Sequence, residues 1–360
     1  MTAWTTAALE ELVSCESPSS DPEATRRCLD LFTGLAGLDG APELIESGGR
    51  HHLRWSWGTP KVLVLGHLDT VWPHGTLARW PFRVDGDVAT GPGVFDMKAG
   101  VVQALAALRT LDSLEGICLL LTTDEEIGSP TSRELILDTV RGCRATLVCE
   151  PSAAGALKTA RKGIALYDVT VTGRAAHAGL EPEKGANAGL ALARFVLAAA
   201  ELGAPDLGTT VTPTLMSAGT TSNTVPAAAR VAVDARAALP AELDRLDADL
   251  RSAARTAAAA VAGTEVLVHG GVNRPPLDAS SSAELFATAV RLADRLGMPA
   301  LQGISVGGGS DGNFTAGAGC PTLDGLGAVG DGAHAEGEHV LLSHLQPRAE
   351  LLAALLEELV

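Results

Sequence analysis

Basic residues are scarce in this sequence, and their scarcity limits the partners that the chain can bind. Lysine and arginine number 27 against 43 aspartates and glutamates, which gives a formal net charge of −16. Nucleic acids and anionic membranes attract proteins through clustered lysine and arginine. We therefore expect no nucleic acid and no membrane among its partners, and we assign most of the acidic excess to a generally acidic surface.

Paired cysteines and long apolar segments are missing as well. The six cysteines are scattered without a Cys-x-x-Cys motif, which argues against a disulfide framework and a zinc–thiolate site. The N-terminal stretch "MTAWTTAALEELVS" lacks the basic region of a secretory signal. The alanine-rich "NAGLALARFVLAAAEL" is too short for a membrane span and is interrupted by Arg194. These absences predict a cytoplasmic globular protein.

The order of strand and helix patterns predicts two domains. In the first part of the chain, "KVLVLG", "GICLLLTT" and "RATLVC" are typical of strands and "AGVVQALAALRTL" of a helix, an alternation that favours an α/β sheet. From residue 161 to 269 the order becomes β-α-β-β-α-β, the ferredoxin-like arrangement. Helical patterns then resume in "SSAELFATAVRLADRLG" and "LQPRAELLAALLEEL". We predict a discontinuous domain of residues 1–160 and 270–360, into which residues 161–269 are inserted.

Side chains that can bind metals recur where the predicted strands end. In α/β sheets the functional groups gather at the carboxyl ends of strands. His67 and Asp69 follow "VLVLG", and Glu150 follows "TLVC". Histidine together with carboxylates is the ligand set of zinc or a similar divalent ion. The other candidates are Asp96 in "GPGVFDMKAG", Glu125 and Glu126 in "TTDEEIGS", and His334 in "GDGAHAEGEHV".

Each of these stretches alone has an ordinary explanation. Asp96 would pass as a helix N-cap, and the run Asp124–Glu126 could be a solvated turn. Their recurrence in one sheet is what favours a shared cation. Adjacent acids on an extended segment point to opposite sides, so the run needs a bend, which Gly128 can supply.

Seven motifs in chain order resemble a known family: "GHLDTV", "GPGVFDMKAG", "TTDEEIGS", "CEPS", "GRAAHAG", "NTVPAAARVAVDAR" and "GAHAEGEHV". They are similar to those of the di-zinc metallopeptidases that include glutamate carboxypeptidase (carboxypeptidase G), aminoacylase, acetylornithine deacetylase and succinyl-diaminopimelate desuccinylase. The glutamate carboxypeptidase branch is the most similar. The resemblance implies a zinc-exopeptidase-like α/β catalytic domain, with a mixed sheet flanked by helices, and an inserted ferredoxin-like α+β lid and dimerisation domain.

The resemblance also implies a metal-ligand set. His67 and Glu150 would hold one ion, and Glu126 and His334 would hold the other. Asp96 would bridge both. The expected cofactor is two divalent ions per chain, zinc first, with cobalt or manganese as alternatives.

Further roles follow from the same resemblance. Glu125 would be the general base, and Asp69 would orient His67. In a homodimer, His177 would reach the scissile carbonyl of the partner's site. Substrate would be bound by Asn223, by Arg274 at its carboxylate, and by Arg236 as a second candidate for that contact.

The implied activity is hydrolysis of an amide or peptide bond that releases a C-terminal amino acid, with glutamate the first to test. An N-acyl-amino-acid deacylase of the acetylornithine or succinyl-diaminopimelate type is the alternative within the family. A non-catalytic amino-acid- or peptide-binding protein is the alternative outside it.

Two Gly-x-Gly-x-x-Gly matches, at residues 307–312 and 325–330, do not follow a first strand, so they are weak evidence for a dinucleotide site.

Overall fold

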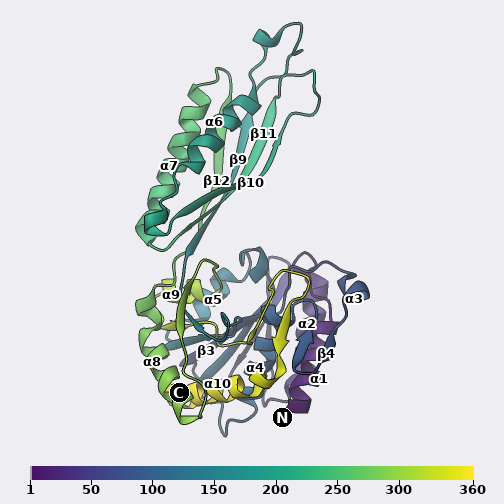
Figure 1. Cartoon of the computed structure of the whole chain (residues 1–360), viewed down its shortest axis with the longest axis vertical. Coiled ribbons are helices and arrows are strands. Elements are labelled where there is room, and N and C mark those ends of the chain that lie inside the picture. Colours follow the sequence, from purple (N-terminus) through teal and green to yellow (C-terminus); the bar gives the residue numbers. More distant parts are fainter. Residues whose placement is uncertain (1) are drawn as a thin grey trace. The chain divides into compact units, whose positions relative to one another are not determined.

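The computed structural model describes residues 2–360, which form two compact units (Figure 1). The first unit contains the residues up to Arg161, together with Leu277–Val306 and Ser310–Val360. The second contains Lys162–Pro276 and Gly307–Gly309. Each unit has its own hydrophobic core.

A mixed six-stranded sheet forms the centre of the first unit, as the expected fold class requires. Its strand order is β1-β2-β6-β3-β7-β14. The strands β6, β3, β7 and β14 are parallel to one another, β2 runs antiparallel to β6, and β1 runs antiparallel to β2. The strands are β1 (Glu43–Ser47), β2 (Arg50–Ser56), β3 (Val62–His67), β6 (Ile117–Thr122), β7 (Ala145–Val148) and β14 (Thr322–Leu323).

Helices cover both faces of this sheet. Successive residues of β3 alternate between two cores: Val62 and Val64 belong to the larger one, whereas Leu63 and Leu65 belong to the smaller, as the period of a strand requires. The larger core is completed by α1 (Thr2–Ser14), α2 (Pro22–Ala36), α4 (Ala99–Leu108), α8 (Ala279–Arg295) and α10 (Leu345–Leu359). The smaller one contains residues of α5 (Arg133–Thr139) and α9 (Gly312–Gly317).

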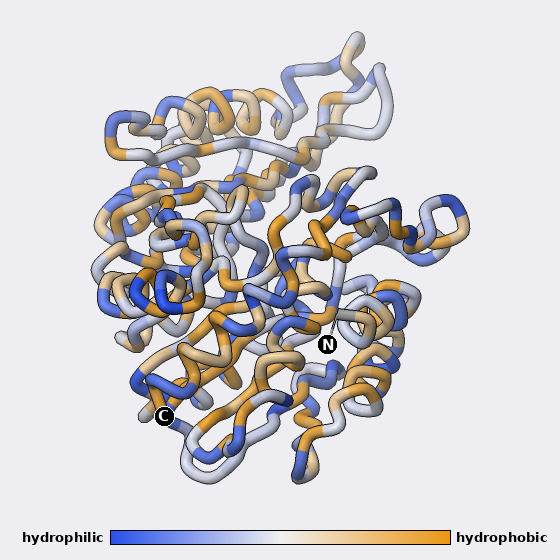
Figure 2. The backbone as a smooth tube through the Cα atoms, turned by 60° about the horizontal axis from the view of Figure 1, so that its bottom comes forward, coloured by the Kyte–Doolittle hydropathy of each residue, from blue (hydrophilic) through white to orange (hydrophobic). Residues whose placement is uncertain are grey.

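The helical turns change between hydrophobic and hydrophilic colours in Figure 2, which is the mark of amphipathic helices that lie on a core. None of the helices in the described part of the chain is long and apolar enough to cross a membrane.

Two smaller sheets join distant segments of the first unit. The short strands β4 (Arg83–Asp85) and β5 (Val88–Thr90) pair with β16 (His339–Leu341) and β15 (Gly330–Asp331) in the order β15-β16-β5-β4. This pairing brings the segment that leads to Asp96 against the segment that contains His334. The other sheet pairs β8 (Leu157–Arg161) with β13 (Gly303–Val306).

The second unit has the expected ferredoxin-like order. Its sheet runs β10-β11-β9-β12 and is antiparallel throughout. Both helices of the unit pack on the same core face, against Tyr167 and Val169 of the central strand. Its elements are β9 (Gly163–Thr172), α6 (Ala188–Ala200), β10 (Thr210–Ala218), β11 (Ala228–Ala237), α7 (Pro240–Ala259) and β12 (Glu265–Arg274).

Candidate metal centre

His67 is the last residue of β3, and its imidazole is 2 % exposed. Its Nδ1 lies 3.0 Å from the carbonyl oxygen of Asp69 and 3.4 Å from the carboxylate Oδ1 of the same residue. A proton on Nδ1 is therefore donated to Asp69, which leaves the lone pair of Nε2 available to a cation. Nε2 faces the carboxylates of Asp96, at 3.4 Å, and Glu150, at 3.6 Å.

Asp96 lies between the two candidate histidines. It belongs to the short turn Val94–Lys98 that precedes α4, and the Asp96–Met97 peptide bond is cis. Its Oδ1 is 3.4 Å from His67 Nε2, and its Oδ2 is 3.3 Å from His334 Nε2. Each carboxylate oxygen therefore meets a different histidine, which is the arrangement that a carboxylate bridging two ions needs.

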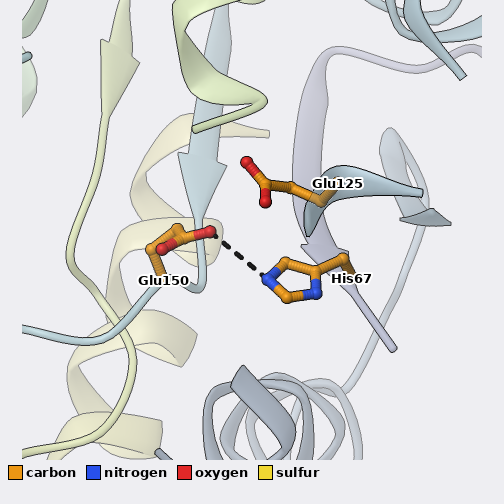
Figure 3. A group of neighbouring side chains, drawn as sticks. All are labelled: His67, Glu125 and Glu150. Atoms are coloured by element: carbon orange, nitrogen blue, oxygen red, sulfur yellow. Dashed lines mark ion pairs between the residues drawn. The ribbon is translucent and has the colours of Figure 1, made fainter. Parts of the chain in front are cut away.

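Glu126 and Glu150 lie on opposite sides of this arrangement. Glu126 Oε2 is 3.1 Å from His334 Nε2, while Glu150 Oε1 is 3.6 Å from His67 Nε2. His334 is half-exposed and has a positive φ of 63° in the loop between β15 and β16. In Figure 3 the side chains of His67, at the end of β3, of Glu125, in the short helix after β6, and of Glu150, in the segment after β7, converge.

The donor atoms fit divalent cations. Three buried atoms of this cluster have no hydrogen-bond partner within the described residues: His67 Nε2, Asp96 Oδ1 and Glu126 Oε1. The four nitrogen–oxygen separations of 3.1–3.6 Å are long for charged hydrogen bonds, which measure about 2.7–2.9 Å. Ligand atoms about 2.0–2.2 Å from a tetrahedral ion are about 3.3–3.6 Å apart. The spacing therefore matches donors arranged around an ion.

Burial and the contacts between histidines and carboxylates also shift the pKa values of the cluster. Hydrogen bonds with Asp96 and Glu126 raise the pKa of His334 to about 10. Burial raises the pKa of Glu126 to about 7. Burial also opposes charge on Asp96 and on His67. Contacts with His334 and His67 nevertheless lower the pKa of Asp96, and contacts with Asp69, Asp96 and Glu150 raise the pKa of His67. Protonated imidazoles offset the negative charge of the carboxylates in this cluster. A metal ion that binds to the imidazoles must displace those protons.

The three adjacent acids after β6 have different surroundings. Asp124 is fully buried and accepts hydrogen bonds from the backbone and hydroxyl groups of Thr131 and Ser132. Glu125 and Glu126 turn away through a short 3₁₀ helix that Gly128 ends with a φ of 89°. This confirms the bend expected at Gly128.

Asp69 has a second task that the sequence did not reveal. Besides contacting His67, its carboxylate accepts the backbone N–H groups of Glu125 and Glu126, both at 3.2 Å, and the hydroxyl of Ser19 at 2.7 Å. One buried carboxylate thus holds the histidine and the acidic turn in a common geometry.

Glu338 was not expected in the site. It is fully buried, and its carboxylate accepts four hydrogen bonds. The donors are the indole of Trp72 at 2.9 Å and the backbone N–H groups of Gly93 at 3.0 Å, Phe95 at 2.8 Å and Asp96 at 2.9 Å. Glu338 therefore fixes the turn that carries Asp96. The sequence signal available was a glutamate four residues after His334, which in an exposed loop would be unremarkable.

Arg161 and Asp324 support Glu150. Arg161 donates two hydrogen bonds to the Asp324 carboxylate, at 2.7 and 2.9 Å, and its Nη2 lies 3.4 Å from Glu150 Oε2. All three side chains are buried. Arg161 therefore compensates the negative charge of Glu150 through Oε2, the oxygen other than the one that faces His67.

In the second unit, His177 and Asn223 are neighbours on adjoining backbone segments. His177 forms an antiparallel bridge with Thr224, and the Ala178 N–H donates to the Asn223 carbonyl at 2.9 Å. Both His177 and Asn223 are exposed. His177 Nδ1 accepts the N–H groups of Gly179 and Leu180, which leaves Nε2 as the donor of a neutral ring.

Arg236 and Arg274 flank the same residue of the central strand β9, because both pair with Ile164. The guanidinium of Arg236 is already hydrogen-bonded within the chain. It donates to both oxygens of Asp234, at 2.8 and 3.0 Å, and to the Gly307 carbonyl at 3.1 Å. Arg274 is 4 % exposed and donates to Asn273.

Comparison with known proteins decides the family. The model of peptidase family M20/M25/M40 matches residues 63–358. The chain belongs to this family. It is 33 % identical over 311 residues to carboxypeptidase G2 of Pseudomonas sp. (strain RS-16), covering 84 % of this chain and 74 % of that protein. A shorter match, 28 % over 137 residues, covers 33 % of this chain and 36 % of a succinyl-diaminopimelate desuccinylase of Ehrlichia canis (strain Jake).

Among solved structures, the M20-family metallo-carboxypeptidase Sso-CP2 of Sulfolobus solfataricus has the same fold. The TM-score is 0.80 at 17 % identity, with 98 % of each chain covered. The resemblance seen in the motifs is thereby confirmed, and this M20 chain is a metallopeptidase-type hydrolytic enzyme. Both the carboxypeptidase reading and the deacylase alternative have counterparts among its relatives.

Proposed function

We propose that this M20 chain is a two-metal carboxypeptidase that cleaves an amide bond and releases a C-terminal amino acid. The observation that carries the proposal is the position of Asp96, whose two oxygens are 3.4 and 3.3 Å from the ring nitrogens of His67 and His334. The likeness to carboxypeptidase G2 along most of the chain supports the direction of cleavage.

The residues that would hold the ions all belong to the first unit. His67 and Glu150 would hold one, Glu126 and His334 would hold the other, and Asp96 would serve both. Two zinc ions bound in this way would lower the pKa of a water molecule and polarise the scissile carbonyl.

Glu125 is the general base in this proposal. Its carboxylate converges with His67 and Glu150 in Figure 3, and its backbone N–H is anchored to Asp69 at 3.2 Å. It takes a proton from the attacking water and returns it to the leaving nitrogen, the usual work of a positioned carboxylate. Asp69 keeps the base and the ligand His67 in register.

Arg274 is our first candidate for the substrate carboxylate. An arginine fork can bind a carboxylate through two parallel hydrogen bonds. Arg236 is the weaker candidate because Asp234 and Gly307 already take up its guanidinium. Arg274→Lys should raise KM more for free-acid substrates than for the same substrates with an amidated C-terminus.

A homodimer through the second unit completes the proposal. Strand β10 is at the edge of its sheet, and it exposes Leu215 (80 %) and Met216 (59 %), while the adjacent α6 exposes Leu197 (70 %). Pairing of two such edges would bury an apolar surface and satisfy the open strand. In such a dimer His177 would donate to the developing oxyanion in the partner's site.

The decisive experiment measures turnover of a matched substrate set by the zinc-loaded enzyme. An N-acyl-glutamate and a dipeptide ending in glutamate test the carboxypeptidase, and acetylornithine and N-succinyl-diaminopimelate test the deacylase. Faster turnover of the latter pair would transfer the assignment to the deacylase. Saturable binding of all substrates without turnover would indicate the non-catalytic binding protein.

The dimer needs its own experiment, in which His177→Ala and Glu125→Gln chains are mixed under subunit exchange. A heterodimer would contain one site with both a base and a partner histidine, so activity should rise. Proven heterodimers without a rise would contradict the shared site.

A further inference from the structure

A cavity of the first unit is lined by none of the candidate metal ligands. It has a volume of about 340 Å³ and is formed by the loop after Glu150, the segment that follows α8, and the start of α10. Ligand pockets range from about 300 to 1,000 Å³, so the cavity can accept a small organic molecule. Its aliphatic lining includes Met298, Pro299, Leu301 and Val329.

One buried cation lines this cavity. Arg348 of α10 is 3 % exposed, its Nη2 donates to the carbonyl oxygen of Gly155, and its Nη1 has no acceptor within residues 2–360. The two other ionisable or amide side chains of the lining, His344 and Gln302, are exposed. No aspartate or glutamate is among the residues that line the cavity.

The missing carboxylate is unusual in a chain with a net charge of −16. Arg161, the other buried arginine among the described residues of the first unit, is matched by Asp324. Burying a charge without a counter-ion is costly, and burial lowers the pKa of Arg348 to about 10. A bound anion would recover part of that cost, and the aliphatic walls would favour one with an apolar body.

We infer that this cavity is a binding site for a small organic carboxylate, which pairs with Arg348 and lays its apolar part against Met298 and Leu301. The site is independent of the proposed catalytic assignment. Its occupant would be a small organic acid, and phosphate, which has no apolar part, would be a poorer ligand.

The methionines of this chain offer an internal test. There are four, Met1, Met97, Met216 and Met298. Met298 lines the cavity, whereas Met97 accepts the backbone N–H of His67 through its sulfur and so reports on the metal cluster. Met216 is exposed in the second unit and serves as a control.

The experiment titrates zinc-loaded protein, labelled with ¹³C at the methionine methyl groups, with butyrate, its uncharged analogue butyramide, and inorganic phosphate. Met298→Leu assigns the reporting signal. We expect butyrate to shift the Met298 signal saturably, at a Kd at least tenfold below that of butyramide and of phosphate. Arg348→Gln should abolish the preference for butyrate, and Arg291→Gln, an exposed arginine paired with Glu358, should preserve it.

Three results would overturn the inference. Equal Kd values for butyrate and butyramide in the native chain would mean that Arg348 only braces the Gly155 loop, and this comparison needs no variant to fold. Met298 shifts that follow the Met97 shifts with a common Kd would place the carboxylate at the metal cluster. Tighter binding of phosphate would rule out an organic acid as the preferred ligand.

Discussion

Replacing Glu338 with glutamine tests how far the Asp96 turn depends on one buried carboxylate. The oxygens of Glu338 each accept two hydrogen bonds, Oε1 from Phe95 and Asp96 and Oε2 from Trp72 and Gly93. A glutamine keeps the shape but presents an NH₂ group at one of these positions. In either orientation of the amide, two of the four N–H groups that Glu338 accepts would face the NH₂ group of the glutamine and lose their acceptor.

The size of the effect follows from those two lost bonds. Hydrogen bonds to a charged group contribute about 1.5–3 kcal/mol each, so a rigid turn would lose about 3–6 kcal/mol in the free energy of unfolding. Movement of the turn would recover part of this loss at the expense of the position of Asp96. Loss of an outer partner of a metal ligand typically weakens metal binding by about 10- to 100-fold, and we expect that range here.

Glu336→Gln provides the matched control, since it makes the same change two residues away. Glu336 is exposed and forms a 3.2 Å ion pair with Arg79, a contact that contributes about 0–1 kcal/mol. Denaturant unfolding of both metal-free variants and competition with a zinc chelator measure the two quantities. Equal stability and equal zinc affinity in the two variants would refute the supporting role of Glu338.

Three further predictions concern other groups. Glu125→Gln should retain bound metal and lower kcat by about 10²–10⁴; a near-native kcat would exclude it as the base. Asp96→Ala should lose more metal by elemental analysis than His334→Ala does, because a bridging ligand serves both ions; two metals retained per chain would contradict the bridge. In the second unit, hydrogen bonds from Arg245 and Thr209 hold the pKa of Glu242 at about 2, below its usual 4.5. The stabilisation is therefore present above about pH 4.5 and is lost as the pH falls toward 2. Thermal unfolding should show Glu242→Gln most destabilised near pH 7 and converging with the native chain at low pH. Asp244→Asn, on the same helix, should show no such convergence.

The candidate ligands could be found without the structure because the signals are local. A buried strand such as "VLVLG" is a continuous apolar run, and the polar residues that follow it must lie at the strand's end. The ferredoxin-like order was accessible for a similar reason, since its strands and helices carry their own periodicities. Only the chemistry of histidine and carboxylate was then needed to expect a cation.

Tertiary structure alone decided how those residues are held. Glu338 meets the Asp96 backbone across 242 positions of sequence, through the pairing of β5 with β16. Arg161 and Asp324, 163 positions apart, support Glu150 in the same way. The cavity around Arg348 joins four separate segments with no shared motif. Sequence patterns describe the neighbourhood of each residue along the chain, whereas burial and charge compensation depend on which distant segments pack together.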